Sequence, residues 1–298
     1  MEKKRYERPT LRKMNTGLMN KFGTKTENVP VSSIEGISVK KLINDFGSPL
    51  FVLSERQIRR NMRNALRIFR TRYPKVQFAW SYKTNYLDAV CQIYHQEGSW
   101  AEVVSGFEYD KALKNGVSGN QIIFNGPDKT DDQLVQAARN NSLIHIDHYD
   151  ELYALIRLSE EHQLQPRVAI RINMDTGIYP KWDRFGFNFE NGQAWNALTR
   201  ILNSSQLQLV GLHCHIGTFM LSPQAYATAA RNLCELAWSV KERYGKMVEY
   251  IDLGGGFPST NTLKGAYLPG TDTVPSLDQF ADAITDVILG YGFRPDEL

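Results

Sequence analysis

The chain has 298 residues, of which 42% are hydrophobic and 22% are charged. Both fractions are typical of globular proteins and argue against a disordered, collagen-like or coiled-coil chain. The formal net charge is +3, but the first thirteen residues hold six Lys or Arg against two Glu. The rest of the chain is therefore nearly neutral, and nucleic-acid binding is not expected.

The N-terminal part is predicted to be an arm followed by short elements. Residues 1–37 form a basic arm and linker, because Asn15–Ser33 is rich in Thr, Gly, Asn and Ser and shows little periodicity. From Ser38 to Phe46 the apolar residues fall on one helical stripe, and Gly47 ends this helix. Leu50–Leu53 is strand-like. A second helix follows, and its apolar stripe consists of Ile58, Met62, Ala65, Leu66 and Phe69.

Residues 38–298 are predicted to form one α/β domain. Short apolar segments alternate with longer helical ones, which is typical of parallel βαβ units in a doubly wound sheet or a (β/α)8 barrel. The seven candidate strands are Val76–Lys83, Trp100–Val104, Gln121–Asn125, Leu143–Asp147, Arg167–Asn173, Leu209–Ile216 and Tyr250–Leu253. A last helix is expected from Ser276 to Leu289.

Alternation of side chains within the strands favours the barrel. One face of each strand is apolar and is predicted to meet the helices; in two strands it consists of Phe78, Trp80, Tyr82, Val210, Leu212, Cys214 and Ile216. The opposite faces are small or polar. Strands covered by helices on both faces are usually apolar throughout, whereas the inner residues of a barrel line the mouth of its active site. We therefore predict a TIM-like barrel.

Neither a membrane segment nor a disulfide framework is predicted. The longest apolar run, Leu152–Ile156, is far below the ~18 residues that cross a bilayer, and no apolar segment follows the basic N-terminus. The cysteines Cys91, Cys214 and Cys234 form no C-x-x-C pair. We expect a cytoplasmic protein with reduced thiols and no membrane partner.

Lys83 is the candidate nucleophile. It is predicted to end the first strand on the inward face, beside the small side chains of Ala79 and Ser81. A lysine in a shielded site has a lowered pKa and becomes an amine nucleophile suited to a Schiff base. The alternative is a lysine at a strand end whose ammonium reaches water.

Gly254, Gly255 and Gly256 directly follow the strand Tyr250–Leu253. Glycines let a backbone approach an anion closely and present its N–H groups, and barrels often hold phosphate in the loop after the seventh strand. The alternative is a flexible turn, because the segment matches neither the dinucleotide nor the P-loop spacing.

His213 and His215 lie two residues apart in a strand and are therefore expected to point the same way. They could serve a metal, but spacing suggests no third ligand, and a neutral imidazole can equally stack on a flat cofactor. We favour stacking and predict no metal. The Thr218 hydroxyl could donate to a phosphate or simply stabilise a turn.

Three further polar residues are predicted to point into the barrel. Arg171 and Asn173 could contact a ligand or form an internal network of salt bridges and hydrogen bonds. Glu102 could serve catalysis or act as a structural partner of Lys83.

Taken together, these motifs resemble the alanine-racemase-like barrel of the ornithine/diaminopimelate decarboxylase family, which uses pyridoxal 5′-phosphate. The resemblance extends over about Ser38–Leu298, and its strongest blocks are Ser81–Asn85, Gly211–Thr218 and Ile251–Pro258. Within that family it is closest to diaminopimelate decarboxylase.

The resemblance implies a role for each site residue. Lys83 forms the Schiff base with the cofactor, and His215 stacks on the pyridine ring. Thr218 and Gly254–Gly256 hold the phosphate, and Arg171 also belongs to the cofactor site. The cofactor acts as the electron sink when carbon dioxide leaves. A homodimer is also implied.

The chain departs from the family pattern at three points. Glu102 stands where the family usually has aspartate, and Asp183–Gly186 carries Arg184 where the family has lysine. After the helix Ser276–Leu289 the family continues with a strand that bears a Glu-Pro-Gly-Arg block and then a C-terminal β domain. Neither is found before Leu298, so the barrel is predicted to lack its eighth strand and the chain to be a fragment.

The favoured function is decarboxylation of a basic or diamino acid such as diaminopimelate. Racemisation on the same barrel is a second reading, and it needs a second base. A third is a cofactor-binding or regulatory homologue without catalysis. A metal-dependent hydrolase that uses His213 and His215 is the least favoured, because no further ligands are suggested.

Overall fold

The computed structural model describes residues 31–260 and 270–294. By contacts the chain divides into two compact units, one of Met1–Leu50 with Ser259–Val274 and one of Phe51–Pro258 with Pro275–Leu298. The basic segment 1–13 and most of the predicted linker lie outside the described residues. We describe each unit by itself.

The first unit contains a short hairpin and two helices. Strands β1 (Ser33–Ile34) and β2 (Ile37–Ser38) pair antiparallel, and α1 (Val39–Phe46) follows directly. Gly47 ends α1 as predicted, because its φ of 87° turns the chain and its N–H donates to Ile43 O at 2.8 Å. The short helix α9 (Gly270–Thr273) belongs to the same unit.

The prediction of a strand at Leu50–Leu53 is wrong. These residues have no strand partner in the described part of the chain, and the Phe51 side chain is 96% exposed. An apolar extended segment becomes a strand only when a neighbouring strand takes up its backbone hydrogen bonds. The local sequence pattern contains no information about such a neighbour.

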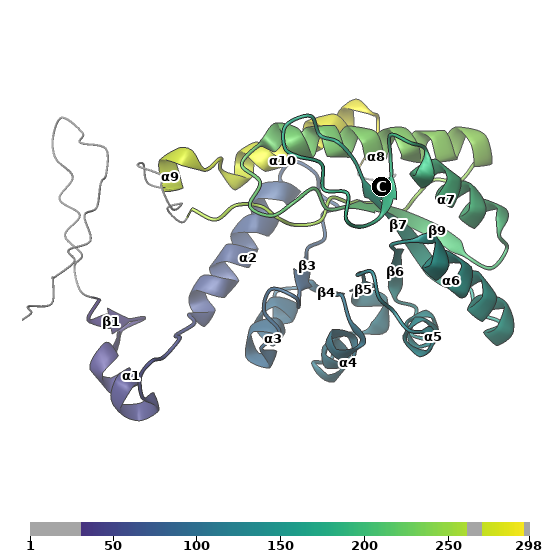
Figure 1. The fold of residues 1–298 in the computed structure, drawn as a ribbon. Coiled ribbons are helices and arrows are strands. Elements are labelled where there is room, and N and C mark those ends of the chain that lie inside the picture. The colour runs from purple at the N-terminus through teal and green to yellow at the C-terminus, as the bar shows by residue number, and fades with distance from the viewer. Residues whose placement is uncertain (1–30, 261–269, 295–298) are drawn as a thin grey trace, which may run out of the picture. The chain divides into compact units, whose positions relative to one another are not determined.

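The second unit is built on one curved parallel sheet, and its seven main strands are those predicted from the sequence (Figure 1). The strands are β3 (Ala79–Ser81), β4 (Trp100–Val103), β5 (Ile122–Phe124), β6 (Leu143–Ile146), β7 (Arg167–Asn173), β9 (Gln208–Cys214) and β10 (Tyr250–Asp252). They lie side by side in chain order, and the two-residue strand β8 (Phe187–Asn188) extends the pairing at the end of β7. In the described residues β3 and β10 each have one strand neighbour.

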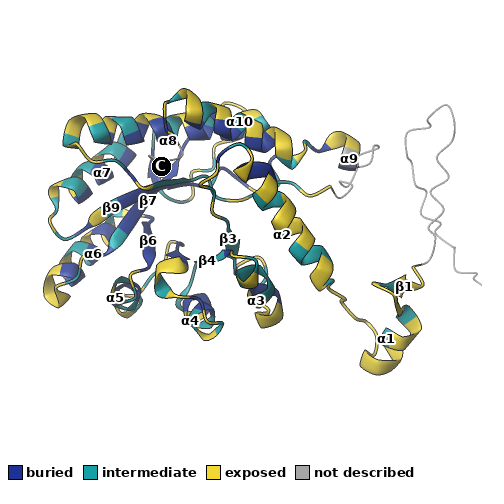
Figure 2. Ribbon diagram, turned by 180° about the vertical axis from the view of Figure 1, so that it is seen from behind, coloured by how far each residue is buried: buried dark blue, intermediate teal, exposed yellow. Residues whose placement is uncertain are grey.

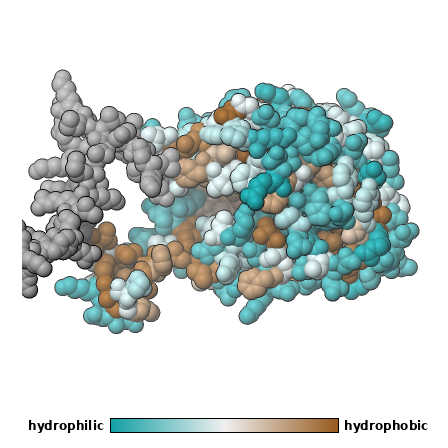
Figure 3. Space-filling view, viewed as in Figure 1, coloured by the Kyte–Doolittle hydropathy of each residue, from teal (hydrophilic) through white to brown (hydrophobic). Residues whose placement is uncertain are grey.

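Helices follow the strands and cover one face of the sheet, which is the barrel arrangement and not the doubly wound one (Figure 1). They are α2 (Glu55–Arg70), α3 (Asp88–Gln96), α4 (Gly106–Lys114), α5 (Asp131–Arg139), α6 (Tyr149–His162), α7 (Gln193–Asn203), α8 (Pro223–Tyr244) and α10 (Leu277–Gly290), with a 3-10 turn at Gly119–Gln121. Their sheet-facing sides are buried and their outer sides exposed (Figure 2). The outer surface is largely hydrophilic on the side seen in Figure 3.

Helix α10 begins and ends close to the predicted Ser276–Leu289 and lies against both α8 and α2. Its start is fixed by a capping box, in which Ser276 and Gln279 bond to each other's backbone N–H groups. At the end of α2, Arg72 pairs with Asp278 and Asp282 of α10. The ring of helices is thus continuous from α10 to α2.

The outer faces of the strands pack against the helices as predicted. The Trp80 ring stacks on Tyr94 of α3 at a centroid distance of 3.7 Å, and the buried Tyr82 hydroxyl lies 3.0 Å from His95 Nε2. Sequence alternation therefore identifies the two faces of β3 correctly.

Val210 is an exception, because it was predicted on the outer face and instead belongs to the floor of the barrel. Residues Val168 and Ala169 pair with Leu209 and Gly211, so Val210 is an extra residue in a bulge. It packs with Ile123 and Leu143 in a small inner cluster. An inserted residue shifts the alternation between inner and outer faces along the strand, which a strictly alternating pattern misses.

None of the described helices is long and apolar enough to cross a membrane. The three cysteines are buried and unpaired, as predicted.

Candidate active site

Because all main strands are parallel, their carboxyl ends meet at one rim of the sheet, and polar side chains gather there. These side chains come from six strands or the residue directly after them: Glu102, Asn125, Asp147, Arg171, His213 and Asp252. The predicted residues Lys83, His215 and Gly254–Gly256 follow β3, β9 and β10 at the same rim. Apolar residues fill the floor below, and this rim is the candidate active site.

Lys83 is not in the strand and not shielded, which corrects the sequence-based expectation. The ladder of β3 ends where Ser81 pairs with Glu102, and residues 82–84 form a turn. The Lys83 side chain is exposed there. Its charge nevertheless lowers the pKa values of Glu102 and His215, so the ammonium lies within electrostatic reach of both. The lysine thus stands at the rim of the site.

Glu102 was predicted as a partner of that lysine, and the two side chains are within electrostatic reach of each other. Burial raises the pKa of its carboxyl, and the Ser81 side chain, His213 and Lys83 act in the opposite direction. This arrangement is consistent with the electrostatic partnership proposed from the sequence.

His215 lies directly after β9 and is half-buried. Burial lowers its pKa to about 4, and His213, Arg171 and Lys83 act in the same direction. The ring is therefore neutral at pH 7. A neutral, flat imidazole at the rim can stack on an aromatic ligand without adding charge.

The three glycines form a turn packed tightly against the loop after β9. Gly254 and Gly256 have φ values of 66° and 94°. A Cβ atom would lie 2.6 Å from Cys214 O at Gly254 and 2.0 Å from Gly217 O at Gly256, whereas the space beside Gly255 is open. Only glycine fits the first and third positions. The turn lies beside the segment that contains His215 and Thr218.

Thr218 is exposed in this loop and close in sequence to that contact. The structure therefore brings together both groups predicted to hold a phosphate. The open cradle beside Gly255 is suited to an anion that approaches the backbone closely.

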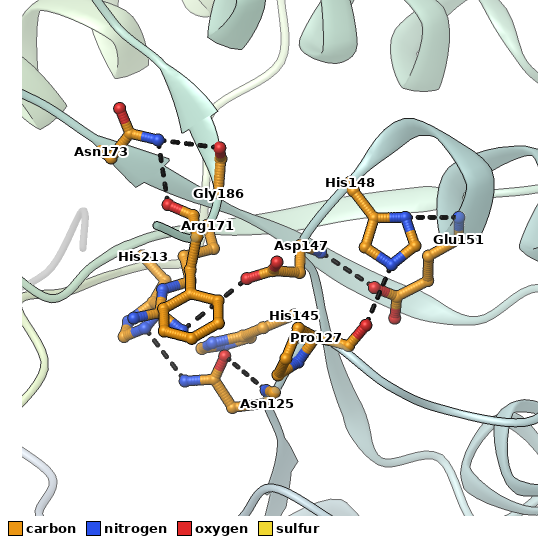
Figure 4. A network of polar contacts seen from close by, with 12 residues as sticks. Asn125, Pro127, His145, Asp147, His148, Glu151, Arg171, Asn173, Gly186 and His213 are labelled. Atoms are coloured by element: carbon orange, nitrogen blue, oxygen red, sulfur yellow. Dashed lines mark hydrogen bonds and ion pairs between the residues drawn. The ribbon is translucent and has the colours of Figure 1, made fainter. Parts of the chain in front are cut away.

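Arg171 is buried, and the carboxylate of Asp147 balances part of its charge. Its Nη1 lies 3.7 Å from Asp147 Oδ1, and its guanidinium stands 4.9 Å from the Phe185 ring centroid (Figure 4). Burial lowers its pKa against the effect of Asp147. Asn173 donates to the backbone oxygens of Phe185 and Gly186, so the segment with the variant Arg184 folds over Arg171. Arg171 and Asn173 thus make internal salt-bridge and hydrogen-bond contacts, which is one of the two alternatives expected from the sequence.

His213 does not pair with His215 but with residues from other strands. Its Nδ1 lies 3.0 Å from Asp252 Oδ2. Its Nε2 lies 3.0 Å from Asn125 Nδ2, a contact that Figure 4 shows. The ring of the fully buried His145 lies beside it, tilted by 36° at a centroid distance of 4.7 Å, and contacts the Tyr250 hydroxyl at 2.9 Å. Burial and His213 hold the pKa of His145 well below its usual value.

Sequence spacing suggests no metal ligand besides the two histidines, but the fold brings two further candidates, His145 and Asp252, close to His213. Ligand atoms of His145, His213 and Asp252 lie within 4.8 Å of one another, and no other such group of three is found among the described residues. The hydrogen bonds argue against a metal, however. Gly126 N donates to Asn125 Oδ1 at 3.0 Å, so Asn125 Nδ2 must donate to His213 Nε2. The ring proton then sits on Nδ1, the atom that a metal would need.

A buried ion pair between Lys129 and Glu151 lies next to the site and was not predicted from the sequence. Lys129 Nζ, with a fully buried side chain, lies 2.6 Å from Glu151 Oε1 and donates to Gly126 O and His145 O. Glu151 also accepts from Asp147 N at 2.9 Å. The pair ties together the loops that follow β5 and β6.

Asn125, His145, Asp147 and Asp252 were also missed, although the signal was present. Each is an inward-facing polar residue at or near the end of a predicted strand, as Arg171 is. Applying the alternation argument to all seven strands would have identified them.

Comparison with protein families decides the relationship. Residues 55–285 match the family model "Pyridoxal-dependent decarboxylase, pyridoxal binding domain". The chain belongs to this family. The match covers the strands and helices that carry every site residue discussed above, and it supports pyridoxal 5′-phosphate as the cofactor of the barrel.

Individual relatives agree. The chain is 29% identical to a diaminopimelate decarboxylase of Methanocaldococcus jannaschii over 87% of its length and 60% of the relative's. It is 30% identical to that of Methanothermobacter thermautotrophicus over 88% and 61%. A crystal structure of the M. jannaschii enzyme superposes with a TM-score of 0.79 at 28% identity, covering 87% of this chain and 61% of that one. The chain therefore spans about three fifths of these relatives.

Proposed function

We propose that this chain is the cofactor-binding barrel of a pyridoxal 5′-phosphate-dependent decarboxylase that acts on a basic or diamino acid, with diaminopimelate the favoured substrate. The observation that carries the proposal is the meeting of Lys83, His215 and the glycine turn at one rim of a barrel that matches the pyridoxal-binding domain. The named relatives favour diaminopimelate. One M. jannaschii structure is described in complex with L-lysine, a diamino acid.

The residues present fit the cofactor. The turn leaves open space beside Gly255 while its backbone packs closely against the loop after β9 at Gly254 and Gly256, and the ring of His215 is uncharged at neutral pH. Lys83 supplies a primary amine at the rim, within reach of water and of an incoming ligand. The glycine turn is suited to a phosphate, the His215 ring to an aromatic ring, and the Lys83 amine to a carbonyl group.

The chain's own residues then have distinct tasks. Lys83 would hold the cofactor through its amine, His215 would offer its uncharged ring to the cofactor's aromatic ring, and Arg171 would add positive charge near the mouth. Thr218 and the glycine turn hold the phosphate. When bound, pyridoxal 5′-phosphate supplies the electron sink for the pair of electrons left behind by the departing carbon dioxide.

A labelling experiment tests the proposal. The full chain is incubated with pyridoxal 5′-phosphate, reduced with borohydride and digested, and the modified peptide is found by mass spectrometry. We expect modification of Lys83, its loss in Lys83→Ala, and no change in the control Lys246→Ala, which replaces another exposed lysine. Equal labelling of the wild type and Lys83→Ala would refute the assignment.

The same protein separates the remaining readings. Release of carbon dioxide from diaminopimelate supports decarboxylation, inversion of the amino acid supports a racemase, and cofactor binding without turnover supports a regulatory homologue. We also propose a homodimer and a cytoplasmic location. The family resemblance motivates the first, and the unpaired cysteines are consistent with the second.

A further inference from the structure

The first glycine of the turn is held by the side chain of Asp252. This residue ends β10, where it pairs in register with His213 of β9. Its Oδ1 accepts a hydrogen bond from Gly254 N at 2.7 Å, and its Oδ2 lies 3.0 Å from His213 Nδ1. One carboxylate thus connects the glycine turn to the inner wall of the barrel.

The far end of this connection is also fixed. Asn125, after β5, is oriented by the hydrogen bond from Gly126 N to its Oδ1, and it donates from Nδ2 to His213 Nε2. The ring proton therefore faces Asp252. A chain of polar contacts runs from the loop after β5, across β9, to the turn after β10.

The negative charge of the Asp252 carboxylate strengthens its hydrogen bond from Gly254 N. Burial alone would raise the pKa of Asp252, but the attraction and contact of His213, with His145 and Gly254 N adding to them, lower it well below its usual range. The carboxylate is therefore ionised throughout the neutral range. A hydrogen bond from a backbone N–H to an ionised carboxylate is shorter and stronger than one to a neutral acceptor.

The rest of the turn is held at two further points. The Tyr226 hydroxyl donates to Gly255 O at 2.8 Å, and Met220 N donates to Gly256 O at 2.9 Å. The turn is thus anchored by side chain and backbone together, with open space beside Gly255.

We propose that Asp252 and His213 are positioning residues that hold the glycine turn in its anion-binding shape, with the Gly254 N–H directed to Asp252 and the amides of Gly255 and Gly256 left for the phosphate. The inference rests on the proposed function, because it takes that phosphate to belong to the cofactor. It gives the pair of His213 and Asp252 a role that neither metal binding nor stacking supplies. A rigid backbone site costs an anion little reorganisation when it binds.

The test compares two ligands that differ only in the phosphate. Pyridoxal 5′-phosphate and pyridoxal carry the same aldehyde and ring, and their affinities are measured by absorbance titration of the full chain. For Asp252→Ala we expect the affinity for pyridoxal 5′-phosphate to fall roughly tenfold or more, as for a lost charge-assisted hydrogen bond. The affinity for pyridoxal should change less than about twofold.

Two further variants sharpen the result. Asp252→Asn keeps an acceptor for Gly254 N but removes the charge, so it should restore part of the lost affinity. His213→Gln should give an intermediate loss. Asp286→Asn, an exposed acidic residue on α10, is the matched control and should leave both affinities unchanged. If Asp252→Ala fails to fold, the Asp252→Asn and His213→Gln titrations decide the question.

The outcomes are distinguishable. If the wild type prefers pyridoxal 5′-phosphate over pyridoxal and the variants keep that preference, the positioning role is wrong while the proposed function stands. An equal fall for both ligands likewise overturns it, because the damage is then not specific to the phosphate. If the wild type binds neither ligand, or shows no preference, the proposed cofactor site itself fails. Zinc or cobalt bound stoichiometrically by the wild type and lost in Asp252→Asn would instead assign these residues to a metal.

Discussion

The two ends of the curved sheet hold their predicted site residues in opposite ways. At β10 the glycine turn is fixed by Asp252, Tyr226 and Met220, which hold all three of its glycines. At β3 the ladder ends early and Lys83 stands exposed in a turn. The difference teaches that the part proposed to hold a phosphate is formed in advance, whereas the reactive amine remains accessible. Variants at the two ends of the sheet, and between them, test this difference.

The largest effect is expected from Lys129→Ala, which breaks the buried pair between the loops after β5 and β6, in the middle of the sheet. Glu151 would keep its buried carboxyl without the ammonium 2.6 Å away. Removing one partner of a buried ion pair typically costs about 3–5 kcal/mol, and urea unfolding measures the loss. Arg157→Ala removes exposed ion pairs with Asp131 and Glu161 and should cost less than about 1 kcal/mol. Equal losses would show that the buried pair has no special weight.

The next effect separates two glycines of the same turn. Gly256→Ala forces a side chain into a positive φ and against the backbone oxygen of Gly217, and we expect a loss of roughly 2–4 kcal/mol in the free energy of unfolding. Gly255→Ala meets open space and should cost less than about 1 kcal/mol. Circular dichroism melts of the two variants measure the difference. Similar melting temperatures would mean that the turn is not held in this shape.

These two predictions rest on contacts that the sequence could not supply, although it supplied much else. Alternating apolar segments located all seven main strands, because burial against helices imposes that pattern on each strand separately. Gly254–Gly256 were identified by composition alone. The floor position of Val210 was missed, because a bulge is a property of two paired strands and not of one.

The candidate site was predictable only where a single segment carries the signal. Asp252, His213 and Asn125 meet because sheet register brings three strands together, and no spacing along the chain encodes that. The exposure of Lys83 depends on where the pairing of β3 with β4 stops. Side-chain type predicts chemistry well, but partners follow from register.

A pH-dependent effect of intermediate size is expected from His215. Its pKa is about 4 in the folded protein, against about 6.5 in an unfolded chain. The unfolded state therefore binds the proton more readily, so this residue contributes full stability above about pH 6.5 and loses it as the pH falls toward 4. The total is at most about 3 kcal/mol.

His215→Phe keeps a flat ring without a titrating group and should remove that part of the pH dependence. Denaturant unfolding of both proteins at pH 7, 5.5 and 4 measures the difference between them. We expect it to change between pH 6.5 and 4 and to be constant above pH 7. A constant difference across the whole range would show that His215 titrates normally in the folded protein.

The smallest effect on stability is expected at the exposed end of the sheet. Lys83→Ala removes a solvent-exposed side chain, so the free energy of unfolding should change by less than about 0.5 kcal/mol. The same variant should raise the pKa of His215, because Lys83 is one of the positive groups that lower it. Titration of the His215 ring protons by NMR measures this directly, and Lys246→Ala serves as the control. A large loss of stability, or an unchanged His215 pKa, would mean that Lys83 is packed into the barrel or lies too far from its mouth. A stable protein with a raised pKa would place an accessible amine beside a rigid ring, the arrangement that an enzyme needs if its cofactor is to be attached after the barrel has folded.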